Sequence, residues 1–374
     1  MNQVVQSSEV ITFAERVMAL LDEGSFNATY KFAVLLGIMD VCIEQTSITG
    51  DPPNSITTRQ LAERVASLYW GQTLPFQVAQ GEAKELRQNK GGQAEIVSEI
   101  ITYQAKHKLR ASSTLRRAQA IDIKSYQSFI HKIEWKLIEM PLPKLQRIAG
   151  HYSPFIYQIN WSDDVKKAHA FQRGGLYAQG FDNRLHLQPN VGRYFATLNS
   201  LLRPLIYRQW AAMVARINKL DDARLEAHLF GFDRISTKKT HGVLQEIQSQ
   251  RCFFCHNKLG KDFDVDHFIP WTRYPNNCLE NFVLAHSKCN RNKRHYLASE
   301  EHLENWLLRF KDDELCNDFE SAARSITWES HMANSLGIGR AIYGSLPENA
   351  LLWKGHKDQF VESSSYAIQR CFES

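Results

Sequence analysis

The chain has 374 residues, of which 43% are hydrophobic, so it can bury sizeable cores and is long enough for two or three domains. Its longest uninterrupted apolar run, Phe32–Met39, is far shorter than the roughly 20 residues that span a bilayer, which argues against a membrane protein. A formal net charge of +5 at pH 7 favours an anionic partner.

Cysteine usage favours metal binding over disulfides. The first ten residues lack the basic start and the apolar stretch of a secretory signal, so we expect a cytoplasmic location. In that compartment cysteines serve more often as metal ligands or buried thiols than as disulfide partners. The chain has seven cysteines, an odd number whose scattered positions do not resemble a disulfide framework.

The first 143 residues are predicted to form a helical domain with a recognition or regulatory role. Apolar side chains at helical spacing predict a helix over 9–23, and the next helix, over 27–44, is apolar nearly all round and therefore buried. An amphipathic helix is expected over 55–70. The segment Pro141–Pro143 marks the expected end of this domain.

Positive charge is concentrated in residues 101–120, which contain no acidic side chain. Clustered positive charge suits a phosphate backbone, so we expect this segment to help position nucleic acid. The alternative, which is commoner for charge runs in general, is a solvated helix face. The basic residues concerned are Lys106, Lys108, Arg110, Arg116 and Arg117.

Residues 144–236 are predicted to form a mixed helical region. A strand is expected over 155–161 and a long helix over 191–220. A shorter helix over 238–249 leads directly into Cys252, where the residues with the clearest chemistry begin. We expect the last segment, 311–374, to be helical, and it carries no recognisable chemistry.

Two short Cys/His pairs predict a structural zinc site. Two residues separate Cys252 from Cys255, and after 30 intervening residues two more separate His286 from Cys289. Structural zinc prefers four tetrahedral sulfur and nitrogen ligands, and each pair supplies two of them from a tight turn. Because these side chains fill the coordination sphere, we expect the zinc to hold the fold together and take no part in chemistry.

The residues between and after these pairs resemble a known nuclease family. Their order is Asp264-Val-Asp266-His267-Phe-Ile-Pro270, then Asn281-Phe-Val-Leu, then Cys289-Asn290-Arg-Asn-Lys293. This order resembles the HNH endonucleases, specifically the branch whose ββα unit is clamped by two zinc knuckles. The resemblance covers about 45 of the 374 residues.

The resemblance implies a role for each polar residue of the motif. His267 is the implied general base, and Asp266 and Asn290 are the implied ligands of a catalytic divalent ion. Asn281 is the implied structural asparagine, which holds the loop bearing His267 through backbone hydrogen bonds. Because an asparagine carbonyl suits hard cations, Mg²⁺ or Mn²⁺ is the expected ion.

Two positions depart from the usual pattern of this branch. His286 stands where the branch normally has cysteine, and a set of three cysteines and one histidine is still an ordinary zinc site. Asn290 stands at the third position of the motif, which gives an HNN arrangement that active members also use.

The basic residues next to the motif are expected to contact phosphate. Arg291, Lys293 and Arg294 follow the last cysteine, although a solvated helix face is nearly as good an explanation for them. The segment 251–295 carries eight Lys or Arg against four Asp or Glu, so much of the positive charge of the chain is local to it.

The predicted fold class is α+β, with mostly helical N-terminal and middle regions and a small zinc-stapled ββα-metal nuclease unit. The expected domains are 1–143, 144–236, 237–310 and 311–374. The expected function is cleavage of DNA, most simply duplex DNA, with structural Zn²⁺ and catalytic Mg²⁺ or Mn²⁺, and no membrane partner.

Two alternatives stay open at the level of the sequence. One is an RNA or tRNA nuclease, and the other is a catalytically silent, zinc-dependent module that binds nucleic acid. The intact Asp266, His267 and Asn290 argue against the silent module. Freestanding HNH proteins with helical extensions often serve restriction or phage defence, and by that analogy alone we expect such a role here.

Overall fold

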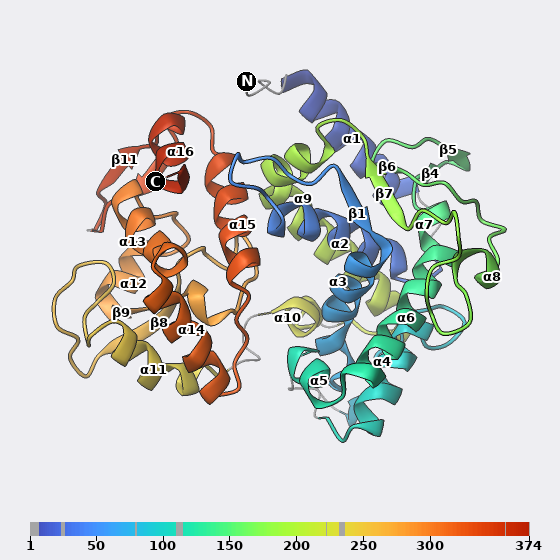
Figure 1. The fold of residues 1–374 in the computed structure, drawn as a ribbon, viewed down its shortest axis with the longest axis horizontal. Helices are drawn as coiled ribbons and strands as arrows, with labels where there is room; N and C mark the ends of the chain where they lie inside the picture. The colour runs from blue at the N-terminus through green and yellow to red at the C-terminus, as the bar shows by residue number, and fades with distance from the viewer. Residues whose placement is uncertain are drawn as a thin grey trace. The chain divides into compact units, whose positions relative to one another are not determined.

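The computed structural model describes residues 7–23, 27–78, 81–109, 115–221, 223–231, 236–355 and 357–373 (Figure 1). The chain divides into two compact units. The first consists of Met1–Cys42 and Pro53–Gly231, and the second of Ile43–Pro52 and Phe232–Ser374. The boundary expected at residue 143 has no counterpart in this division, because residues on both sides of it belong to the first unit. The mixture of helices with small antiparallel sheets agrees with the expected α+β class.

The first unit is mainly helical. Its helices are α1 (Ser7–Glu23), α2 (Tyr30–Glu44, whose last two residues belong to the second unit), α3 (Thr58–Trp70), η1 (Gly71–Thr73), α4 (Glu95–Lys106), α5 (Leu115–Ile121), α6 (Ile123–Glu139), α7 (Pro141–Lys144), α8 (Lys167–Ala170), α9 (Val191–Asn218) and α10 (Leu225–Phe230). The helices expected over 9–23, 27–44 and 191–220 are confirmed within a few residues. Among the described helices, none is long and apolar enough to cross a membrane.

Helix α3 begins three residues later than expected. Its N-terminus is a capping box, in which the Thr57 side chain accepts from the backbone of Gln60 and the Gln60 side chain accepts from the backbone of Thr57. The preceding residues form β1 (Ser55–Thr57), which pairs antiparallel with β7 (Arg184–Leu187). Residues 55–57, which the apolar periodicity placed in the helix, therefore form a strand because they pair with β7.

Small antiparallel sheets complete the first unit. Strands β1, β7 and β6 (Tyr157–Gln158) form one sheet, in the order β1-β7-β6. The strand expected over 155–161 is shorter than predicted, because the Gln146 side chain accepts from the backbone amides of Phe155 and Ile156 in place of a neighbouring strand. Two further pairs are β2 (Phe76–Gln77) with β3 (Ala83–Lys84) and β4 (Arg147–Ile148) with β5 (His151–Tyr152).

The core of the first unit surrounds α2, most of which is buried. Trp210 of α9 stacks on Phe32 of α2 and meets Tyr69 of α3 edge to face, with ring centroids 6.2 and 5.1 Å apart. The Trp210 indole donates to Gln88, so the one polar atom of this buried ring is satisfied.

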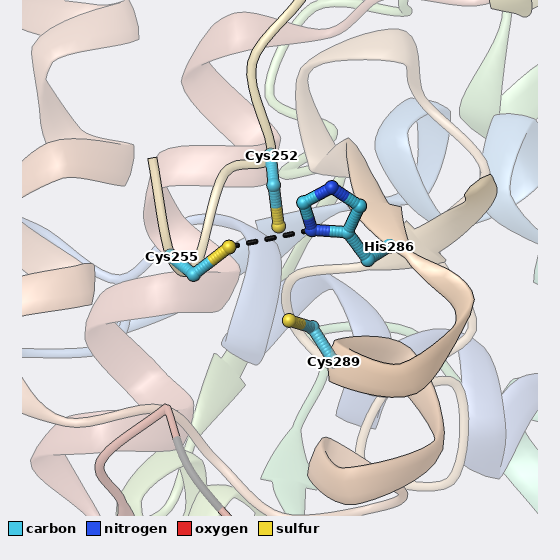
Figure 2. Close-up of side chains that lie close together, drawn as sticks. All are labelled: Cys252, Cys255, His286 and Cys289. Carbon is cyan, nitrogen blue, oxygen red and sulfur yellow. Dashed lines mark hydrogen bonds between the residues drawn. The ribbon is translucent and has the colours of Figure 1, made fainter. Parts of the chain in front are cut away.

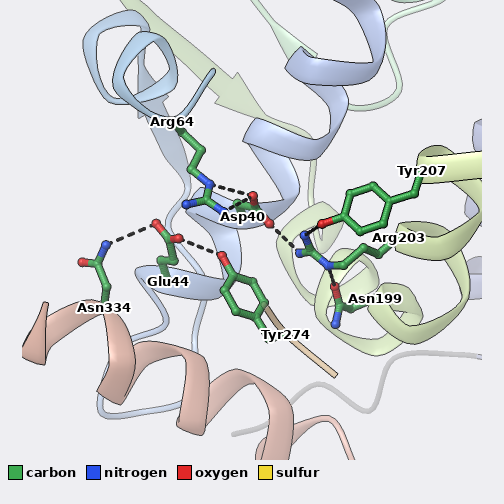
Figure 3. Close-up of polar contacts among 8 residues, drawn as sticks. All are labelled: Asp40, Glu44, Arg64, Asn199, Arg203, Tyr207, Tyr274 and Asn334. Atoms are coloured by element: carbon green, nitrogen blue, oxygen red, sulfur yellow. Dashed lines mark hydrogen bonds and ion pairs between the residues drawn. The ribbon is translucent and has the colours of Figure 1, made fainter. Parts of the chain in front are cut away.

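A buried carboxylate pairs with two arginines in this core. Asp40 of α2 is fully buried and accepts from Arg64 of α3 and Arg203 of α9, as Figure 3 shows. Burial alone would raise the pKa of Asp40, but the two guanidinium groups outweigh burial and hold this pKa below its usual value. The group is therefore ionised in the folded protein at neutral pH.

Removing this charge should destabilise the first unit strongly. Asp40→Asn leaves a buried guanidinium without its counter-charge, so we expect the free energy of unfolding to fall by about 3–5 kcal/mol. Denaturant unfolding measures this change. The matched control is Glu63→Gln, which breaks the partly exposed Arg59–Glu63 pair and should change stability by less than about 1 kcal/mol. Equal effects of the two substitutions would contradict this account.

The second unit contains two paired strands followed by a short helix. Strands β8 (Phe263–His267) and β9 (Phe282–His286) are antiparallel, with Asp266 opposite Val283, and α12 (Ser287–Lys293) follows at once. The expected helix before Cys252 is present as α11 (Thr240–Ile247). The remaining elements are η2 (Thr237–Lys239), η3 (Leu279–Asn281), α13 (Glu300–Lys311), α14 (Asp313–Ser325), α15 (Met332–Gly344), β10 (Leu351–Trp353), β11 (Phe360–Glu362) and α16 (Ser365–Glu373).

Two features of the second unit differ from the expected division. Residues 43–52 belong to it, although they were expected in the N-terminal domain. The segment expected to be helical after residue 311 includes the hairpin of β10 with β11, in which Gly355 adopts a φ of 104° that favours glycine.

Helix α13 fixes the turn that leads into β9. The Trp306 indole and the Arg309 guanidinium both donate to the backbone carbonyl of Glu280, and Arg309 also donates to that of Phe282. The Trp306 ring stacks on Phe268, with centroids 4.8 Å apart. These contacts hold the two ends of the loop between β8 and β9.

Candidate functional site

The four side chains expected to bind zinc lie together. Cys252 and Cys255 lie in the turn after α11, His286 ends β9 and Cys289 lies in α12 (Figure 2). Their ligand atoms all lie within 4.8 Å of one another, and Cys255 Sγ is 3.3 Å from His286 Nδ1. The cluster is compatible with zinc binding.

The hydrogen bond of His286 orients its ring for a metal. Its Nε2 lies 3.1 Å from the backbone carbonyl oxygen of Lys258, which can only accept, so Nε2 carries the proton and donates. Nδ1 then keeps a lone pair that faces the three sulfur atoms (Figure 2). A histidine ligand whose other nitrogen donates to a carbonyl is the usual arrangement in protein metal sites. The donor set therefore fits zinc in both chemistry and orientation.

Protein purified without added metal should carry close to one zinc per chain. The four donors fill a tetrahedral shell, which gives a closed and tightly held site. Elemental analysis of folded protein measures the ratio. Folded protein without zinc, and without another soft metal in its place, would contradict the assignment.

His267 is the last residue of β8 and contacts the side chain of Asn277 in the following loop. Only 7% of the residue is exposed, and its Nε2 lies 3.0 Å from the side-chain oxygen of Asn277. Because an amide oxygen only accepts, Nε2 donates in this contact, and a neutral ring then carries its proton on Nε2 and its lone pair on Nδ1. Burial lowers the pKa of His267 to about 4, so the ring is neutral at neutral pH. A neutral imidazole of this tautomer can accept a proton at Nδ1.

Two carboxylate side chains that could ligate a metal lie on the same face of β8. Asp264 and Asp266 alternate along the strand, so both side chains face one side of it. The side-chain NH₂ of Asn290 in α12 donates to Asp264, at 3.1 Å. This bond leaves the Asn290 carbonyl oxygen as the atom that can ligate a cation. Burial raises the pKa of Asp266, and the nearby ammonium of Lys293 opposes that rise.

Lys293 was expected to contact phosphate, but its side chain lies inside the second unit. The side chain is fully buried, and its Nζ lies 3.0 Å from Asp266 Oδ2 and donates to the backbone carbonyl of His267, at 2.8 Å. A buried ammonium needs such partners, because its desolvation would otherwise be costly. Lys293 therefore ties α12 to the end of β8 and does not reach a phosphate on the surface.

Asn281 makes the backbone hydrogen bonds expected of it. The residue is fully buried, its side-chain oxygen accepts from the amide of Ile269, and its NH₂ donates to the carbonyls of Ile269 and Asn276. It thus joins both ends of the loop that follows His267.

Most of the other basic residues expected to contact nucleic acid are exposed where the structure describes them. Arg291 and Arg294 of the second unit and Lys106, Lys108 and Arg117 of the first are exposed. Arg110 and the side chain of Arg116 lie outside what the structure describes. Lys106 donates to Ser125, so this side chain packs along α6.

Two residues of the site were not assigned from the sequence. Asn277 contacts His267, and Asp264 contacts Asn290. The alternation of Asp264 with Asp266 was a usable signal, because it places both acids on one face of a strand. Asn277 had no comparable signal, since its role depends on the path of a loop.

Comparison with known families supports a nuclease assignment for part of the chain. A family model described as HNH endonuclease matches residues 254–299, which contain most of the metal cluster and the whole of the motif, and it points to a nuclease or nucleic-acid-binding role with a metal site. A second model, described as Domain of unknown function (DUF8808), matches residues 12–229, more than half of the chain, and the chain therefore belongs to this family. No curated protein and no solved structure matches the chain.

Proposed function

We propose that the protein is a divalent-ion-dependent HNH endonuclease that hydrolyses phosphodiester bonds of DNA. One observation carries the proposal: His267, whose Nε2 is held by Asn277, ends the same strand that carries Asp266, and Asn290 is hydrogen-bonded to that strand. Phosphodiester hydrolysis needs a proton acceptor and oxygen ligands for a hard cation, and β8 with the neighbouring α12 carries both.

Each residue has a defined part in the proposed reaction. His267 Nδ1 accepts the proton of the attacking water, while the bond from Nε2 to Asn277 holds the ring in the required tautomer. Asp266 and Asn290 would hold Mg²⁺ or Mn²⁺, which when bound neutralises charge on the phosphate and on the departing oxygen. Lys293 orients the Asp266 carboxylate, and the exposed Arg291 and Arg294 of the α12 segment can face phosphates.

The zinc cluster has a structural part in this proposal. Its four ligands join the turn before β8, the end of β9 and α12, so a bound zinc would hold in place the elements that carry His267 and Asn290. We assign Zn²⁺ to this site and the hard divalent ion to the other.

A substrate panel tests the proposed function. Purified protein is incubated with supercoiled plasmid, single-stranded DNA and RNA, each with Mg²⁺, with Mn²⁺ and with EDTA. We expect ion-dependent disappearance of supercoiled plasmid, whether one strand is nicked or both are cut. Cleavage confined to RNA would assign the protein to RNA nucleases, and binding without any cleavage would assign it to silent binding modules.

The proposed cellular setting is restriction or phage defence in the cytoplasm. This proposal rests on analogy with HNH proteins that carry unrelated helical extensions. A lower efficiency of phage plating in cells that carry the protein than in cells that carry a His267→Ala variant would support it, and equal plating would contradict it.

The basic segment of the first unit is proposed to bind the nucleic-acid backbone. A cationic side chain that pairs with a phosphate releases counterions, so removing one such side chain should reduce the salt dependence of binding by roughly one unit of slope. We expect Ala at Lys106, Lys108 and Arg117 to weaken binding about equally across sequences and to flatten this slope, with zinc content unchanged. Fluorescence anisotropy at several salt concentrations measures the slope, and an unaltered slope would assign these residues to a solvated helix face.

A further inference from the structure

The loop between β8 and η3 carries the partner of His267 but little regular structure. Residues 271–278 lack both helix and strand, and Asn277 lies near the end of this loop. Side chains from elsewhere in the second unit hold it: the Trp328 indole donates to the carbonyl of Asn277, and the NH₂ of Asn276 donates to Ser335 of α15. The loop conformation therefore depends on interactions with remote parts of the chain.

Tyr274 is the buried side chain in the middle of this loop. It is 1% exposed, and its hydroxyl donates to a carboxylate oxygen of Glu44, at 2.7 Å. The other oxygen of Glu44 accepts from the side chain of Asn334 in α15, at 3.2 Å, as the left half of Figure 3 shows. The distance is that of a well-formed hydrogen bond from a hydroxyl to an oxygen. This buried bond therefore restrains the middle of the loop.

The position of Glu44 is itself fixed by the backbone of α15. A Cβ atom at Gly337 would lie only 2.0 Å from the carbonyl oxygen of Glu44, so this close approach requires glycine. Asn334 and Gly337 thus hold Glu44 from the same helix. The carboxylate is presented to Tyr274 by a rigid support.

We propose that Glu44 is a positioning residue for the nuclease site, acting through Tyr274 and the loop to hold Asn277 against His267. The inference rests on the proposed function and assigns an additional residue to that same site. Glu44 lies outside the segment that matches the HNH endonucleases and inside the segment that matches the family of unknown function. The residue that supports the loop would then lie in the segment that matches the family of unknown function, outside the matched nuclease segment.

Single substitutions test the hydroxyl–carboxylate bond. Tyr274→Phe keeps the buried ring and removes the hydroxyl, so we expect kcat to fall roughly 10- to 100-fold, with KM, zinc content and melting temperature near those of the wild type. Glu44→Gln keeps an oxygen that accepts from Tyr274 and should retain most of the activity, whereas Glu44→Leu should match Tyr274→Phe. The control is Tyr366→Phe, which removes an exposed hydroxyl of the same unit and should have no effect.

A double-mutant cycle tests the route through Asn277. If Tyr274 acts by holding Asn277, Tyr274→Phe should cause no further decrease of kcat in an Asn277→Ala background. Decreases that multiply would mean that the two residues act independently and would overturn the proposed route. A decrease that merely follows the fraction of unfolded protein would assign Glu44 and Tyr274 to stability alone.

Hydrogen exchange tests the inference without any activity. We expect Tyr274→Phe to accelerate exchange of the amides in 271–278, with β8 and β9 unchanged. Unchanged exchange in this loop would overturn the inference even if the nuclease is active. If the wild type cleaves no nucleic acid while the loop loosens in the variant, the proposed function fails and the restraint by Glu44 stands.

Discussion

The His267→Ala variant is expected to lose cleavage almost completely while remaining folded. A positioned general base contributes about 10²- to 10⁴-fold to a rate, so the rate constant for cleavage should fall by that factor under saturating substrate. The His267 ring is not one of the four ligands of the metal cluster, so zinc content and affinity for nucleic acid should stay near those of the wild type. Single-turnover cleavage with parallel zinc analysis measures the rate and the metal content.

The control for this variant is another histidine of the same unit. His295 is exposed and follows α12, and His295→Ala should cleave at the wild-type rate. A His267→Ala protein that cleaves normally would show that another group removes the proton. A variant that has lost its zinc or its fold would show that His267 serves stability before catalysis.

The second large effect is expected from removal of a zinc ligand. Cys252→Ser removes one of four donors that join the turn before β8 to β9 and α12. Structural zinc sites in small peptides contribute about 10–16 kcal/mol of folding free energy, which is comparable with the whole stability of a typical domain, about 5–15 kcal/mol. We therefore expect zinc-free protein, rapid hydrogen exchange across 251–295 and low solubility.

Three further variants separate the loss of a metal ligand from the loss of a thiol. Cys316→Ser changes a cysteine outside the cluster and should leave zinc content and exchange unchanged. His286→Cys replaces one zinc ligand with another and should keep the zinc. His286→Ala removes the ligand and should lose the zinc. Retention of one zinc by Cys252→Ser, with unaltered exchange, would contradict a structural role for the cluster.

The local parts of the site could be predicted from the sequence. The two Cys/His pairs have the short spacing of metal ligands, and the structure brings all four together. The backbone hydrogen bonds of Asn281 also follow the expectation, since they join residues close in sequence to it. Helices with a clear apolar periodicity, such as α1 and α9, were placed within a few residues for the same reason, because 3.6-residue periodicity is a local signal.

The parts that depend on distant interactions could not be predicted. Lysine is almost never fully buried unless it is paired, so nothing local indicated that Lys293 would lie against Asp266. The bond of Glu44 to Tyr274 joins positions 230 residues apart. The assignment of residues 43–52 to the second unit has the same origin, because no change in composition marks the point where α2 passes from one unit to the other.

The most direct test of the central claim is plasmid cleavage by protein that keeps its zinc but has been freed of other divalent ions. The protein is treated briefly with EDTA, dialysed, and analysed for zinc before plasmid is added. With close to one zinc per chain and no added ion, we expect no cleavage, and Mg²⁺ or Mn²⁺ should restore it in the wild type but not in His267→Ala. Cleavage at an undiminished rate in EDTA, or no cleavage of DNA with either ion at full zinc content, would contradict the account.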